Sequence, residues 1–163
     1  MTEDLHVPEP NPWPAVIGPC YVEESLRREL RVSGMGIIRA AQERRVLQIV
    51  TSDGVNVYPA FQVQEHQIVP GLGPVLRELE TGSGSALMWA QWLNKPVKRS
   101  NGQTRRRIDE LSAGHVEALV HEARHTAAAW LGDGSREVEM VTVRAALTLL
   151  VTSRDVKAVG DQP

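Results

Sequence analysis

The residue types best suited to chemistry in this sequence are the histidines and the glutamate of the segment HEARH, residues 121–125. In the pattern H-E-x-x-H, two imidazoles one helical turn apart hold zinc, and the glutamate between them serves as a general base. A catalytic zinc site also needs a third protein ligand and an open coordination position, and the acids after His125 lie on no obvious ligand helix. We therefore expect no enzyme activity, no cofactor and no bound metal, with a zinc protease that uses His121, Glu122 and His125 as the alternative.

A long amphipathic helix is predicted to carry HEARH. The segment HVEALVHEARHTAAAWL repeats apolar residues at intervals of three and four, which aligns them along one helix face. The predicted buried stripe consists of Val116, Leu119, Val120, Ala123, Ala127, Trp130 and Leu131. The preceding sequence must supply the elements on which this stripe packs.

Two short helices joined by a tight turn are predicted between residues 21 and 42. Ser33 precedes the second helix, where its hydroxyl can accept a hydrogen bond from a free backbone N–H group. This order indicates a helix-turn-helix motif. The predicted apolar positions are Val22, Leu26 and Leu30 in the first helix, and Met35, Ile38 and either Ala41 or Gln42 in the second.

A β-hairpin is predicted directly after these helices. Residues 46–50 and 55–58 are rich in residues that favour strands, and the dipeptide Asp53-Gly54 between them is a strong hairpin signal. Two helices followed by a hairpin follow the order of a winged helix-turn-helix.

The segment VNVYPAFQV gathers aromatic residues in a chain that has few of them. Pro59 is expected to end the second strand of the hairpin, because proline has no N–H group for the ladder. We expect Tyr58, Pro59 and Phe61 to form an apolar joint between the wing and the part that follows.

The rest of the chain is predicted to be helical. Leu72, Val75, Leu76 and Leu79 have helical spacing, SALMWAQWLNKP forms a helix that ends before Pro96, and IDELSAG forms a last short turn of helix. The segment VKRSNGQTRRR between these helices is predicted to be a turn-rich loop. The expected fold class is mainly α, with a winged helix-turn-helix followed by a helical domain.

Composition limits the class of protein. The chain has 163 residues, 42% of them hydrophobic, and a formal net charge of −2, so any contact with nucleic acid depends on a local basic face. Its single cysteine, Cys20, suits a reducing compartment, and no apolar run reaches the ~20 residues that cross a bilayer. The acidic, proline-rich N-terminus does not resemble a signal peptide. We expect a cytoplasmic protein without membrane contact.

Four regions are expected along the chain. They are a flexible proline-rich arm at 1–20, a winged helix-turn-helix at 21–62, a helical partner-binding domain at 63–131, and an extension of uncertain structure at 132–163.

The order of these features resembles a known family. A helix-turn-helix, a hairpin that ends in YPAFQ, the helix PGLGPVLREL, the segment WLNKP and then IDELSAG are similar to the antitoxins of the Xre/MbcA/ParS type. The helix-turn-helix itself resembles the winged form of MerR-like and excisionase-like proteins. The resemblance covers residues 21–130 and implies a DNA-binding domain followed by a domain that binds a RES-type toxin. It implies operator DNA and this toxin as the partners.

The second helix of a helix-turn-helix lies in the major groove, which predicts the residues that contact DNA. Residues 21–62 carry six arginines and five acids, and their net charge of +1 is small for contact with DNA phosphates. A homodimer on a palindromic operator is expected. A motif kept as a scaffold, and a mobile-element regulator without a toxin, are the alternatives. The candidate DNA-binding residues are Ser33, Arg39, Gln42, Arg44 and Arg45.

A second basic segment is a candidate for protein binding. Residues 95–107 contain six cations and no acid, which suits either phosphate contact or docking on an acidic partner surface, with a solvated loop as the alternative. Trp89 and Trp92 share one face of a predicted helix, where they serve either the core or an interface. The candidate partner-binding residues are Trp89, Trp92, Lys98, Arg105 and Arg106.

Overall fold

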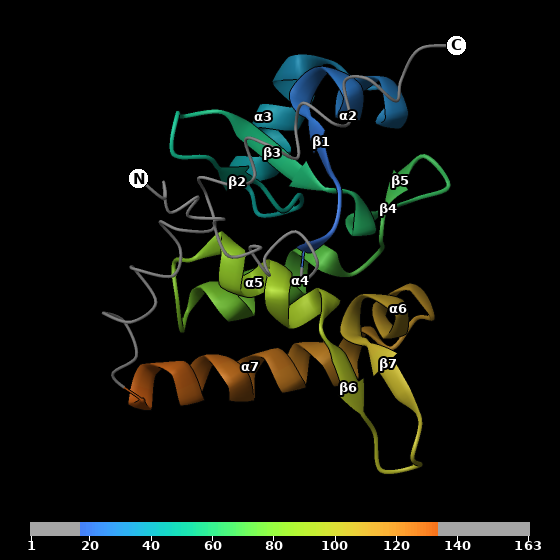
Figure 1. Cartoon of the computed structure of the whole chain (residues 1–163), viewed down its shortest axis with the longest axis vertical. Helices are drawn as coiled ribbons and strands as arrows, with labels where there is room; N and C mark the ends of the chain where they lie inside the picture. Colours follow the sequence, from blue (N-terminus) through green and yellow to red (C-terminus); the bar gives the residue numbers. More distant parts are fainter. Residues whose placement is uncertain (1–16, 134–163) are drawn as a thin grey trace, which may run out of the picture.

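The computed structural model describes residues 17–133 (Figure 1). The first half of this region contains β1 (Cys20–Val22), α2 (Glu23–Leu30), α3 (Gly34–Gln42), β2 (Ile49–Val50), β3 (Asn56–Pro59) and the short 3-10 helix η1 (Ala60–Gln62). The second half contains β4 (Val63–Gln64), β5 (Gln67–Ile68), α4 (Leu72–Glu80), α5 (Ala86–Asn94), β6 (Pro96–Lys98), β7 (Thr104–Arg106), α6 (Arg107–Ser112) and α7 (Val116–Gly132). The fold is mainly helical with small antiparallel sheets.

A three-stranded antiparallel sheet with the order β1-β3-β2 supports the two N-terminal helices. The predicted hairpin is present as β2 and β3, with Ile49 opposite Val57. Strand β1 was not expected: Val22 belongs to it and pairs with Val57 instead of starting the first helix. The sequence favours this because Cys20, Tyr21 and Val22 suit a strand, while two glutamates follow at the first turn of α2, where negative charge is favourable.

Helices α2 and α3 pack on this sheet through a small core of their own. Leu26, Ile37 and Tyr58 are fully buried there, together with Ala40 and Val46. The Tyr58 hydroxyl donates a hydrogen bond to Oε1 of Gln48, 3.1 Å away. Burial, together with the negative charge of Glu23, raises the pKa of Tyr58 to about 12. Figure 1 shows this layer at one end of the molecule.

The buried face of α3 differs from the one predicted. The helix buries Ile37, Ala40 and Ala41, whereas Met35 is 72% and Ile38 39% exposed. Both sets have helical spacing, and the sheet residue Tyr58 decides between them because it packs against the set that contains Ile37.

Helices α4, α5 and α7 build the larger core, with α7 lying along α4 at the other end of the molecule (Figure 1). Helix α4 buries all four predicted positions, Leu72, Val75, Leu76 and Leu79. Helix α7 buries Leu119, Ala123 and Ala127, half-buries Val116, Val120 and Trp130, and leaves the predicted stripe residue Leu131 55% exposed.

This core also includes the start of the described chain. Ile17 is 1% and Cys20 2% exposed, and both pack in one cluster with Leu47, Leu76 and residues of α5. The folded body therefore begins within the arm predicted at 1–20, whose residues 1–16 lie outside the described region. Of the extension predicted at 132–163, only Gly132 and Asp133 are described.

The segment YPAFQ lies between the two cores, with Tyr58 in the smaller one and Phe61 against the larger one. Tyr58 and Pro59 are buried, and Pro59 closes β3 opposite Cys20 of β1. Phe61 is only half-buried, against the larger core. The centre of the joint is Gln62, which is fully buried and was not singled out from the sequence.

Two hairpins lie where no hairpin was predicted. Strands β4 and β5 pair across Glu65 and His66, both with positive φ. Strands β6 and β7 pair through the basic segment predicted as a loop, with Pro96 opposite Arg106. None of the helices within residues 17–133 is long and apolar enough to cross a membrane.

Candidate functional site

Helix α3 is the second helix of the helix-turn-helix, and its start is fixed as the sequence predicted. Ser33 is the N-cap, and its Oγ accepts a hydrogen bond of 3.1 Å from the backbone N–H of Gly36. This bond satisfies one of the free N–H groups of the first turn. The Ser33 hydroxyl is thus engaged within the protein, and its role here is to cap the helix.

The outward side of α3 carries four residues at positions i, i+3, i+4 and i+7: Met35, Ile38, Arg39 and Gln42. All four are exposed, so the structure brings the predicted base-reading pair Arg39 and Gln42 onto one stripe. Two large apolar side chains continue this stripe toward the N-terminus of the helix. We call these four residues the α3 stripe.

The two arginines after α3 were both predicted to contact phosphates, and the structure gives them protein partners. Nη2 of Arg44 lies 2.7 Å from Oε1 of Glu80, and its guanidinium lies 5.6 Å from the ring centre of Trp89. Arg44 therefore ties the end of α3 to the end of α4, and its predicted contact with phosphate stays a prediction. Arg45 pairs with Glu43 at 2.7 Å but stays exposed.

A groove of about 710 Å³ runs beside α3, between the helix-turn-helix and the start of α4. Its floor is apolar and includes Ile37 and Val46, and its rim holds Arg39, Arg45 and Arg77. Arginine is the side chain best suited to bidentate contact with phosphate or guanine. The rim therefore adds Arg77 to the basic residues around the α3 stripe.

The wing is short. Its tip, between Thr51 and Val55, is closed by a hydrogen bond of 2.8 Å from the Thr51 N–H to the Val55 carbonyl. Asp53 at the tip accepts a hydrogen bond from the Thr51 hydroxyl. A tip with an acid is poorly suited to phosphate contact, so α3 and the groove rim carry the basic character of this face.

The predicted partner-binding residues fall into two groups. Trp89 is 3% and Trp92 7% exposed, and their indole N–H groups donate to the Ser83 carbonyl at 2.9 Å and to Oγ1 of Thr126 at 3.0 Å. Both rings are core residues, which is one of the two roles considered for them, and as buried side chains they do not form an exposed partner-binding surface.

The cations of the second group lie on the β6–β7 hairpin. Lys98 and Arg105 are exposed there. Arg106 is half-buried, and it pairs with Asp109 at 2.8 Å and donates to Asn94 Oδ1 at 2.7 Å. The structure therefore leaves Lys98 and Arg105 on the surface and gives Arg106 a role at the start of α6.

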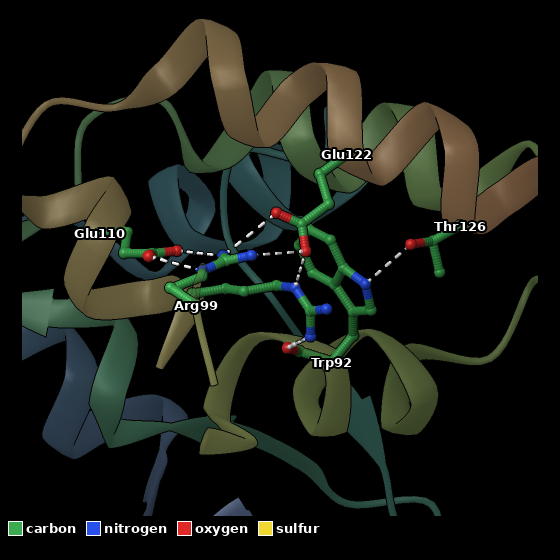
Figure 2. Close-up of polar contacts among 6 residues, drawn as sticks. Trp92, Arg99, Glu110, Glu122 and Thr126 are labelled. Atoms are coloured by element: carbon green, nitrogen blue, oxygen red, sulfur yellow. Dashed lines mark hydrogen bonds and ion pairs between the residues drawn. The ribbon is translucent and has the colours of Figure 1, made fainter. Parts of the chain in front are cut away.

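The glutamate of HEARH belongs to an ion-pair network (Figure 2). Glu122 accepts from Arg99 at 3.1 Å and from Arg107 at 2.6 Å, and Arg99 also pairs with Glu110. The guanidinium of Arg107 lies 4.3 Å from the ring centre of Trp92. This network fastens the β6–β7 hairpin and α6 to α7.

The network determines what the Glu122 carboxylate of HEARH contacts. Both carboxylate oxygens of Glu122 are engaged by guanidinium groups, so neither is free to take a proton from water on a metal. Within residues 17–133 no group of three or more His, Cys, Asp or Glu side chains could hold a metal ion. His121 and His125 are exposed on the outer face of α7.

The network predicts a loss of stability in acid. Burial opposes the charge on Glu122, but hydrogen bonds from Arg107 and Arg99 and their positive charges outweigh it and lower the pKa of Glu122 below its usual 4.5. A carboxylate with a lowered folded-state pKa stabilises the fold above its unfolded-state pKa, and this contribution is lost as the pH falls through the folded-state value. We expect wild-type stability to fall below pH 4.5, and Glu122→Gln to be about 2 kcal/mol less stable at pH 7 with a flatter profile. Urea unfolding from pH 3 to 7 measures both.

The matched control is Glu117→Gln, an exposed carboxylate on the same helix. It should keep the wild-type profile. A Glu122→Gln profile that runs parallel to that of the wild type would contradict the role of the network.

The functional residues that sequence reasoning missed are those whose partners lie far along the chain. Arg77 is separated from α3 by the four strands β2 to β5 and the short helix η1, and Glu80 lies 36 positions after Arg44. The sequence signal for both was the run RELE at the end of the predicted helix, which mixes charges but names no partner.

Comparison with known proteins adds a likeness of fold. No protein-family model matches the chain, and no curated protein matches it in sequence. The NMR structure of Rv2175c, a Mycobacterium protein, is similar to this structure with a TM-score of 0.54 at 19% identity. The match covers 77% of this chain and 86% of that one. At this level of identity the likeness concerns the fold alone.

Proposed function

We propose that this chain is a DNA-binding transcriptional regulator that inserts α3 into the major groove. The observation that carries the proposal is the α3 stripe: Met35, Ile38, Arg39 and Gln42 all face solvent on the second helix of a winged helix-turn-helix. In this motif the second helix enters the groove and its early residues meet base edges. The protein acts by occupying its site and not by catalysis.

The stripe has two kinds of chemistry for base edges. Arginine forms a bidentate contact with the O6 and N7 atoms of guanine, and glutamine does so with the N6 and N7 atoms of adenine. Apolar side chains contact the C5-methyl group of thymine. The order along α3 therefore matches a half-site in which thymine lies near Met35 and Ile38, followed by a purine near Arg39 or Gln42.

The basic rim of the groove beside α3 provides the phosphate contacts. Arg45 and Arg77 line this rim next to Arg39. These residues are few, so the salt dependence of binding should be shallow. For roughly two to three phosphate contacts per chain we expect a slope of about −2 to −3 in a plot of log K against log salt.

The first test replaces the polar half of the stripe. Duplexes selected by the purified protein from a random library serve as the probe. We expect Arg39→Ala and Gln42→Ala each to weaken binding by about 1–3 kcal/mol and to relax the base preference at one position. Gel shift and repeated selection measure these two effects, and circular dichroism checks the fold.

Arg105→Ala is the matched control, because Arg105 is an exposed arginine on the distant β6–β7 hairpin. It should bind the selected duplex like the wild type. If no duplex is selected, or if Arg39→Ala and Gln42→Ala both bind normally, the proposal is wrong.

The second test addresses the apolar half of the stripe. Replacing single thymines of the selected duplex by deoxyuridine removes one methyl group and leaves base pairing intact. We expect one or two such positions to lose about 1 kcal/mol of affinity, which is the value of about one buried methyl group. In Met35→Ala or Ile38→Ala the same replacement should cost nothing further. Equal affinity for every deoxyuridine duplex would refute methyl contact and leave DNA binding untouched.

A homodimer on a palindromic operator and a RES-type toxin as protein partner are the narrower proposals. The sequence resemblance supports the toxin, and the exposed cations Lys98 and Arg105 offer an acidic partner a place to dock. Co-purification with a RES-domain protein tests it: Arg105→Glu should weaken the complex, and absence of any complex would end the proposal.

A further inference from the structure

The two histidines of HEARH remain after Glu122 has been assigned to the ion-pair network. His121 and His125 are exposed on successive turns of α7, and their Nε2 atoms lie 3.1 Å apart. The ring centres are 4.6 Å apart and the rings are nearly perpendicular, at 79°. The same nitrogen of each imidazole thus lies within reach of one shared ion.

The geometry points to a two-histidine binding site for a divalent cation of the Zn²⁺ or Cu²⁺ class at this position. Imidazole nitrogen binds zinc at about 2.0–2.1 Å, so two nitrogens 3.1 Å apart would subtend about 100° at a shared ion. This angle lies between the right angle of neighbouring ligands in square or octahedral sites and the tetrahedral angle. Imidazole is a preferred ligand for zinc, copper and nickel.

The surroundings hold the pair in place and leave it accessible. Helix α7 is fastened from its other side by the buried Ala123 and Ala127. The nearby cation Arg124 is held by Glu78, at 2.8 Å. Glu117 lies one turn before His121 at helical spacing, where its negative charge favours a cation. With two protein ligands, the remaining coordination positions face solvent and are filled by water or by a ligand from another molecule.

Without metal, a single hydrogen bond between the two Nε2 atoms accounts for the same contact. One imidazole carries hydrogen on Nε2 and donates it to the Nε2 lone pair of the other. Metal binding requires both rings to carry their hydrogen on Nδ1. This changes the tautomer of one ring and leaves both rings neutral. This site is a binding site and takes no part in hydrolysis, because Glu122 is engaged elsewhere.

The test titrates the full chain with ZnCl₂ and with CuCl₂ by calorimetry in a non-chelating buffer. We expect one high-affinity ion per chain, and His121→Ala and His125→Ala should each weaken it at least about tenfold, since even outer residues of metal sites change affinity by about that factor. His115→Ala is the matched control: His115 is an exposed histidine at the start of the same helix whose side chain makes no capping bond. It should bind like the wild type.

Electron paramagnetic resonance of the Cu²⁺ complex gives an independent readout. The wild type should show two imidazole nitrogens on copper and each single variant one. Because both side chains are exposed, the variants should keep the wild-type circular dichroism. A double variant that binds as tightly as the wild type, or a copper spectrum with one imidazole in the wild type, would overturn the site.

Discussion

Gly82→Ala should lower the free energy of unfolding by about 3 kcal/mol or more. Gly82 is buried in the turn between α4 and α5, where it lies against Ala127 of α7. A methyl group there would lie 2.7 Å from the carbonyl carbon of Ala127 and closer still to the Cα and oxygen of that residue. Because these are backbone atoms inside a helix, no side-chain rotation relieves the clash, and α7 must move away from α4. Urea unfolding at equilibrium measures the loss.

Gly84→Ala is the control, two residues along the same turn. A Cβ at Gly84 has no atom within 4 Å, so the variant should match the wild type or gain a few tenths of a kcal/mol, about the value for removing a glycine from the unfolded chain. If Gly82→Ala is as stable as Gly84→Ala, then α7 does not lie against this turn as described.

Gln62→Leu should cost about 2–5 kcal/mol. The fully buried Gln62 amide accepts a hydrogen bond of 2.8 Å from the Leu47 N–H and donates one of 2.9 Å to the Leu47 carbonyl. Leucine has a similar size but leaves both backbone groups of Leu47 buried without a partner, at about 1–3 kcal/mol each. Unfolding measures the total, and hydrogen exchange at the Leu47 amide shows where the loss arises.

The control for this prediction is Gln67→Leu, which makes the same change at an exposed position of β5. It should change stability by less than about 0.5 kcal/mol. A Gln62→Leu protein that loses little stability while its Leu47 amide stays protected would show that another group satisfies this backbone.

The Gln62 prediction concerns the way the helix-turn-helix is held on the rest of the molecule. Gln62 ties the segment after α3 to the joint, and Arg44 ties the end of α3 to Glu80 of α4. The direction in which the α3 stripe faces therefore depends on contacts between residues 15 and 36 positions apart.

The sequence was informative where a signal is local. The Ser33 cap, the spacing of the apolar residues in α4, and the end of α5 before Pro96 follow from hydrogen bonding, helical periodicity and the chemistry of proline. The exposure of Arg39 and Gln42 followed in the same way, because polar side chains at helical spacing favour the solvent side.

The sequence was misleading where two local patterns compete or where a turn is unusual. In α3, Ile37 with two alanines and Met35 with Ile38 both have helical spacing, and the larger apolar residues were preferred. The β4–β5 turn uses Glu65 and His66 with positive φ, whereas asparagine or glycine is the usual signal. Nothing in these residue types indicated a hairpin.

By itself the sequence determined the order of the α-helices, the helix-turn-helix and the positions of its exposed polar residues, because these depend on neighbours within one or two turns. Only the tertiary structure decided which partners Glu122 of HEARH has. Arg99 and Arg107, 23 and 15 positions away, engage its carboxylate. Ion pairs between residues far apart in the sequence form only when the chain folds back on itself. The periodicity of the sequence does not predict them.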